Sequence, residues 1–136
     1  MREETYLGKE NLDILQNKKI AIIGVGAIGS SHALLLTKLG IKNLIVVDRD
    51  IVQKENLSTQ VLYTKKDLNN PKVEVCKEAL KKINKDINIT KVFDHLDFKN
   101  INKILKDSDL ILDGTDNLST RFLIDEYCKK NNKVWI

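Results

Sequence analysis

Three glycines in the motif Gly-Val-Gly-Ala-Ile-Gly, residues 24–29, constrain the fold of this chain more than any other feature. The apolar run 20–23 comes directly before the motif, and a helix-like stretch follows it as far as Leu39. Asp48 stands nineteen positions after the last glycine. A strand, a glycine loop, a helix and an acidic residue in this order and spacing are typical of a βαβ nucleotide-binding unit.

Each glycine of the motif has its own expected task. Gly24 permits the tight turn after the strand, Gly26 lets the backbone approach a phosphate, and Gly29 allows the helix to pack closely on the strand. The N-terminus of the helix then offers free N–H groups and the positive end of its dipole to an anion. We therefore predict nucleotide binding, although this motif does not by itself choose between ATP and NAD.

The composition describes a folded chain of ordinary size, because 136 residues with 42% apolar and 31% charged residues suffice for one domain with a substantial core. No apolar run approaches the roughly 20 residues of a membrane span, and residues 1–4 carry no apolar leader. The net charge of +4 is modest. We therefore expect a cytoplasmic protein that binds neither membrane nor nucleic acid. Cys76 and Cys128 form no C-x-x-C pair and are expected to be buried thiols.

Strand-like and helix-like segments alternate along the chain, which predicts an α/β fold: a Rossmann-like, open, mostly parallel sheet with helices on both faces. Residues 1–136 are expected to form one nucleotide-binding domain, the N-terminal part of a longer architecture, because the sequence stops within its last expected strand. We expect helices over residues 9–16, 26–39, 71–83, 98–106 and 118–130, and strands over residues 19–24, 43–48, 88–93, 110–113 and 134–136.

Local sequence also predicts some details of these elements. Asn70 is expected to cap the helix 71–83, with Pro71 as its first residue, and Asp97 to cap the helix 98–106. Trp135 is expected in the core. The stretch 49–70 is long and mixed in character, so we expect it to carry part of a site.

Three further segments match one pattern together with the glycine motif. They are Asp48-Arg49-Asp50-Ile51-Val52 followed by Asn56-Leu57-Ser58-Thr59-Gln60, then Asn70-Pro71-Lys72, and later Leu112-Asp113-Gly114-Thr115-Asp116-Asn117. With these motifs in this order, the chain resembles the adenylating family of ThiF, MoeB and HesA, which is related to the ubiquitin-activating enzymes. The resemblance implies a dimeric enzyme that uses ATP and magnesium (Mg2+). Such enzymes adenylylate the C-terminal glycine of a small ubiquitin-like or sulfur-carrier protein.

The resemblance also implies a role for each matching position. Asp116 would hold magnesium with Asn117 beside it, and Asp48 would take the ribose hydroxyls of the nucleotide. Asp116 and Lys72 would be the catalytic residues. The remaining contacts to the nucleotide would come from the glycine loop and from the segments along the phosphates, namely Gly24, Gly26, Ala27, Gly29, Asn56, Leu57, Ser58, Thr59 and Lys72.

Residue chemistry agrees with several of these roles. A carboxylate at the end of the strand 43–48 can accept two ribose hydroxyl bonds, and Lys72 in the first turn of its helix can reach a phosphate as a compact charge. Asp113 and Asp116 flank the carboxyl end of a strand, the edge at which open α/β sheets bind ligands. Magnesium needs only one or two carboxylates beside phosphate oxygens.

Simpler interpretations of these candidate site residues stay open. Asp48 suits an NAD site equally well, Lys72 is one of twenty lysines, and Asp113 or Asp116 can cap the helix 118–130. His95 is expected to be solvated in a loop.

One position departs from the family. Thr59 stands where the family carries an arginine that faces the triphosphate, and a neutral side chain cannot replace that charged fork. The second half of the family's architecture is also not in this sequence. An NAD-dependent oxidoreductase and a non-catalytic nucleotide-binding or scaffold subunit therefore remain as alternative functions.

Overall fold

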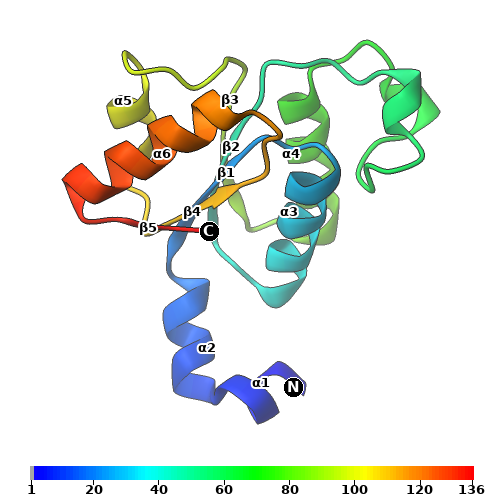
Figure 1. Ribbon diagram of the computed structural model, residues 1–136. Helices are drawn as coiled ribbons and strands as arrows, with labels where there is room; N and C mark the ends of the chain where they lie inside the picture. The colour runs from blue at the N-terminus through cyan, green and yellow to red at the C-terminus, as the bar shows by residue number, and fades with distance from the viewer. Residues whose placement is uncertain (1) are drawn as a thin grey trace.

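All five expected strands form, and they make one parallel sheet (Figure 1). The computed structural model describes residues 2–136. The strand order is β3-β2-β1-β4-β5. The chain proceeds outward from β1 through β2 to β3 and then returns to the other side of β1 with β4, so the open α/β fold is confirmed. The strands are β1 (Lys19–Ile23), β2 (Asn43–Val47), β3 (Asn88–Val92), β4 (Leu110–Asp113) and β5 (Val134–Trp135).

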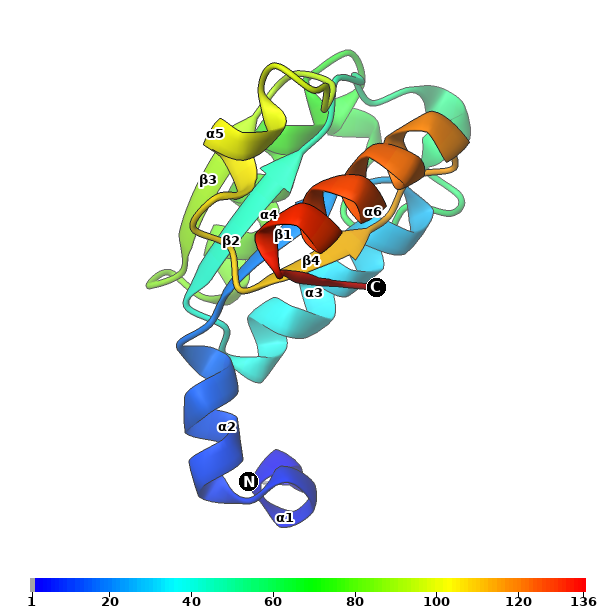
Figure 2. The same ribbon diagram turned by 60° about the vertical axis from the view of Figure 1, so that its left-hand side comes forward.

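Helices cover both faces of the sheet, as Figure 2 shows, because β1 carries apolar residues on both of its sides. Ile20 and Ile22 belong to one core cluster, with residues of α3 and α4, whereas Ala21 and Ile23 belong to the other, with residues of α5 and α6. Burial of both faces is what a parallel sheet requires. The helices are α1 (Arg2–Leu7), α2 (Lys9–Gln16), α3 (Ala27–Leu39), α4 (Lys72–Ile83), α5 (Ile101–Leu105) and α6 (Leu118–Asn131).

The long connection between β2 and α4 contains two short 3-10 turns, η1 (Lys54–Asn56) and η2 (Lys65–Asp67). The start of α4 differs from the prediction. Pro71 has φ −56° and ψ 131°, so it is the residue before the helix and not its first residue, and Asn70 is not the N-cap. The physical reason is tertiary, because Pro71 forms an isolated antiparallel bridge with Ile51 that keeps its backbone extended.

Two more expectations need correction. The helix predicted over 98–106 is shorter: residues 98–100 form a turn in which Asp97 Oδ1 accepts from the backbone N–H groups of Lys99 and Asn100 (2.8 and 2.9 Å), and the residue before the helix is Asn100, not Asp97. Helix α5 starts only at Ile101. Trp135 packs against a core cluster but is only partly buried, since β5 is the edge strand. Helix α1 was not expected, and α1 and α2 extend away from the sheet (Figure 1).

Both cysteines are buried free thiols, as predicted. Burial, followed by the nearby negative charge of Asp48, raises the pKa of Cys76 to about 12, which keeps this thiol neutral and a poor nucleophile at physiological pH. None of the helices within residues 2–136 combines the length and the apolar character needed to cross a bilayer.

Candidate functional site

A cavity of about 470 Å³ lies beside the carboxyl ends of the central strands, where the segments that follow β1, β2, β3 and β4 converge. This is the edge at which open α/β sheets bind ligands, and it includes the place between β1 and β4 where the strand order reverses. The lining residues are Ile23, Gly24, Gly26, Ala27, Ile28, Val47, Asp48, Arg49, Asp50, Gln60, Lys72, Asp94, His95, Leu96, Gly114, Thr115, Asp116, Asn117 and Thr120.

The glycine loop has the geometry that its sequence predicts. Gly24 has φ +85°, a left-handed conformation that disfavours any side chain, and its N–H donates to the Val47 carbonyl (2.7 Å). A methyl carbon on Gly29 would lie 1.7 Å from the Gly24 carbonyl oxygen. Gly29 is therefore a packing glycine that brings α3 against the loop, and it does not line the cavity. Gly26 does line it, and α3 begins at the next residue.

Val25 is held from both sides. Its N–H donates to Asp48 Oδ2 (2.9 Å), and its carbonyl accepts from the Tyr63 hydroxyl (2.6 Å). Tyr63 is buried, and burial raises the pKa of its hydroxyl, which stays a neutral donor. Asp48 Oδ1 also accepts from the Asp50 N–H (2.8 Å). Each carboxylate oxygen has a second lone pair, so Asp48 orients the glycine loop and still has acceptor capacity toward the cavity.

Lys72 is the first residue of α4 and one of the few buried charged side chains, with 6% of the side chain exposed. Its backbone N–H donates to the Asp50 carbonyl (2.9 Å), and its Nζ lies 4.0 Å from Asp50 Oδ2. Asp50 is exposed, so this pair is a weak contact by itself. Lys72 therefore brings a cation to the cavity wall that an anionic ligand can neutralise.

The segment after β4 is fixed by Asp113, whose side chain is only 3% exposed. Its carboxylate accepts from Arg121 Nε (2.7 Å) and from the N–H and hydroxyl of Thr115 (2.9 and 2.6 Å). Asn117 caps α6, because its side-chain oxygen accepts from the Thr120 N–H (3.3 Å). Neither Asp113 nor Asp116 caps this helix. Asp116 lines the cavity, is exposed, and has no ion pair or hydrogen bond within the described residues.

The structure brings most of the predicted site residues to the cavity, but not all of them. The segment 56–59 stays outside the lining. Asn56 Oδ1 accepts from the Gln53 N–H (2.8 Å) and closes η1, Leu57 packs against the core, and Ser58 and Thr59 are exposed. The predicted residues that do line the cavity are Gly24, Gly26, Ala27, Asp48, Lys72, Asp116 and Asn117.

Gln60 and His95 line the cavity although sequence reasoning did not place them there. Gln60 Oε1 is buried and has no hydrogen-bond partner in the described part of the chain. Gln60 belongs to the quoted motif 56–60, so that motif could have indicated it. His95 is exposed in a loop, as predicted, but this loop follows β3 and forms one end of the cavity. Only the strand order places it there.

Comparison with known proteins decides the family. The model of the ThiF family matches residues 2–136. The chain belongs to the ThiF family. Among curated members, the chain is 39% identical over 114 residues to the molybdopterin-synthase adenylyltransferase of Haemophilus influenzae, with 84% of this chain and 47% of the relative covered. It is 31% identical to the sulfur carrier protein ThiS adenylyltransferase of Bacillus subtilis, with 95% and 40% covered. The chain thus spans less than half the length of these relatives.

Solved structures show the same fold. The tRNA N6-threonylcarbamoyladenosine dehydratase TcdA of E. coli superposes with a TM-score of 0.92 at 23% identity, over 98% of this chain and 56% of TcdA. The structure of E. coli MccB with AMPCPP and MccA superposes with a TM-score of 0.85 at 28% identity, over 91% of this chain and 36% of MccB. The ThiF-family fold is therefore shared across nearly the whole chain.

Proposed function

We propose that this chain is the nucleotide-binding unit of an adenylyltransferase that uses ATP to activate the C-terminal glycine of a small ubiquitin-like or sulfur-carrier protein. The observation that carries the proposal is the cavity, which gathers the glycine loop, Asp48, Lys72 and Asp116 at the edge of the sheet. Membership of the ThiF family and relatives named as adenylyltransferases support it. Residues 1–136 would form one domain, the N-terminal part of a longer architecture.

In the proposed reaction, a carboxylate oxygen of the acceptor's last glycine attacks the α-phosphorus of ATP, and the bond to pyrophosphate breaks. The products are an acyl-adenylate and pyrophosphate. The protein must align the carboxylate and neutralise charge on the phosphates, without covalent participation. In this scheme Gly26 and Ala27 approach the phosphates at the start of α3, Asp48 accepts the ribose hydroxyls, and Lys72 supplies positive charge.

Magnesium fits this site only together with a nucleotide. No three His, Cys, Asp or Glu side chains gather into a metal site within residues 2–136. Asp116 is exposed on the cavity wall with its carboxylate oxygens free of protein partners in the described residues. One carboxylate, phosphate oxygens and water are a set of ligands that magnesium commonly takes. Asp116 would hold the ion, with Asn117 beside it, and the ion would neutralise phosphate charge.

MgATP is expected to bind this chain at least about tenfold more tightly than NAD, because Lys72 and Asp116 line the cavity and suit a magnesium-bound triphosphate. Calorimetric titration with and without magnesium measures this. Asp116→Ala should abolish the gain in ATP affinity that magnesium provides. Asp86→Ala, which removes an exposed carboxylate outside the cavity, should preserve that gain. Tighter binding of NAD would instead favour the oxidoreductase.

A non-catalytic nucleotide-binding or scaffold subunit is the second candidate, and Thr59 favours it. Thr59 is exposed, neutral and outside the lining of the cavity, where the resemblance leads us to expect an arginine at the triphosphate. Exchange of radiolabelled pyrophosphate into ATP, measured with the full-length protein and its acceptor, separates the two functions. An adenylyltransferase catalyses the exchange, whereas a scaffold that only binds ATP does not.

We also propose that the chain forms a homodimer and works in the cytoplasm, where its buried free cysteines stay reduced. Helix α3 exposes two large apolar side chains, Ile28 (57%) and Leu35 (64%), and an interface between two chains would remove them from water. Light scattering should therefore give about twice the mass of 15.5 kDa, and Leu35→Lys should shift the population toward monomer. A monomer at every concentration would contradict self-association.

A further inference from the structure

One end of the cavity has no part in the proposed chemistry. It is formed by residues 94–96, directly after β3. β3 lies beyond β2 in the sheet, so this end is on the far side of Asp48 from the glycine loop. A nucleotide with its phosphates at the glycine loop and its ribose at Asp48 would, if it continues along the cavity in the same direction, place its base at the end beside β3. That end carries His95.

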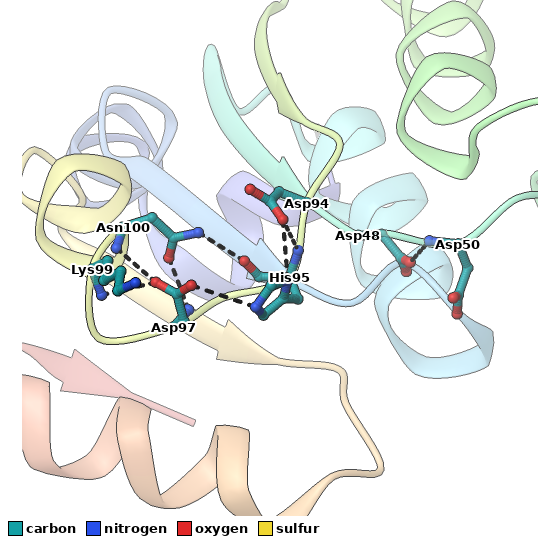
Figure 3. A network of polar contacts seen from close by, with 7 residues as sticks. All are labelled: Asp48, Asp50, Asp94, His95, Asp97, Lys99 and Asn100. Carbon is teal, nitrogen blue, oxygen red and sulfur yellow. Dashed lines mark hydrogen bonds and ion pairs between the residues drawn. The ribbon is translucent and has the colours of Figure 1, made fainter.

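Two carboxylates, those of Asp94 and Asp97, lie beside the ring of His95 (Figure 3). Its Nδ1 lies 3.1 Å from Asp94 Oδ1, and its Nε2 lies 3.4 Å from Asp97 Oδ2. The His95 carbonyl accepts from Asn100 Nδ2 (2.8 Å), which ties the loop to the start of α5. Asp97 is anchored in turn by the N–H groups of Asn100 and Lys99, and these bonds, that of Asn100 first, lower the pKa of its carboxyl.

Both nitrogens on the edge of the His95 ring thus lie close to carboxylate oxygens, at 3.1 and 3.4 Å. The side chain is 57% exposed and lines the cavity. Histidine is among the aromatic side chains on which proteins stack nucleobases, and a ring that is already oriented loses little freedom when a base stacks on it. We propose, resting on the proposed function, that His95 is the stacking platform for the adenine base of ATP.

Calorimetric titration with MgATP and with magnesium tripolyphosphate, which has no base, tests this assignment. His95→Ala should weaken MgATP binding about tenfold and leave tripolyphosphate binding unchanged. His95→Phe keeps an aromatic ring and should stay within about threefold of the unchanged chain. Phe98→Ala is the matched control, because Phe98 is an exposed aromatic residue of the same segment that does not line the cavity.

The possible outcomes distinguish a failure of the stacking assignment from a failure of the proposed function. Equal MgATP affinity of His95→Ala and the unchanged chain overturns the stacking assignment and leaves the proposed function standing. An equal loss for MgATP and tripolyphosphate also overturns the assignment, because the residue then acts on the phosphates or on the fold. An unchanged chain that binds no ATP overturns the proposed function and the assignment with it. If His95→Ala does not fold, His95→Gln takes its place, since glutamine is polar but has no ring. The comparison is then between His95→Gln, which should weaken MgATP binding, and His95→Phe, which keeps a ring and should not.

Discussion

Gly29→Ala is expected to destabilise the folded chain by at least about 3 kcal/mol, which is the upper end of the usual cost of overpacking. The added methyl carbon would lie 1.7 Å from the Gly24 carbonyl oxygen and 2.8 Å from the Gly24 carbonyl carbon. Both atoms belong to the backbone, so α3 or the glycine loop must move. Equilibrium unfolding in urea measures the loss, which is a large fraction of the roughly 5–15 kcal/mol that stabilises a typical domain.

Gly26→Ala is the matched control, because it adds the same methyl group three positions earlier in the same glycine motif. The nearest atom to this carbon is Gln60 Nε2 at 3.6 Å, an ordinary van der Waals contact, and φ at Gly26 is −81°. We expect a change within about 1 kcal/mol, comparable to other substitutions at a helix N-cap. Equal losses for the two variants would show that the close approach of α3 to the loop does not limit stability.

Lys72→Ala is expected to weaken MgATP binding between about tenfold and 150-fold, the equivalent of a charge-assisted hydrogen bond of about 1.5–3 kcal/mol. Lys72 is buried on the cavity wall, and its only ion pair in the described residues is the 4.0 Å contact with the exposed Asp50. A triphosphate would therefore be its strongest partner. Calorimetric titration at fixed magnesium concentration provides the measurement.

Lys82→Ala provides the comparison for Lys72, because Lys82 is an exposed lysine of the same helix that does not line the cavity. This variant removes the same formal charge and should bind MgATP as the unchanged chain does. An affinity of Lys72→Ala equal to that of Lys82→Ala would mean that Lys72 serves only the packing at the start of α4. Thermal unfolding of both variants separates a folding defect from a binding defect.

The order and boundaries of most elements were predictable because the patterns behind them are local. Apolar runs placed every strand to within one residue at each end, and α2 was predicted with its observed bounds, Lys9–Gln16. Gly40 ends α3 in the left-handed conformation that such a residue favours at a helix end. The departures have non-local or competing causes, namely the bridge between Pro71 and Ile51 and the turn that Asp97 holds before α5.

The residues of the candidate site also fall into those that local sequence predicts and those that only the tertiary structure places. The sequence by itself determined the glycine loop, the position of Asp48 after β2 and that of Asp116 after β4, because each depends on a short motif next to a strand. Only the tertiary structure decided that Lys72 is buried at the cavity and that the segment 56–59 stays outside it. The tertiary structure also brought His95 to the same cavity, because strand order, which no local pattern encodes, decides which loops meet at one edge of a parallel sheet.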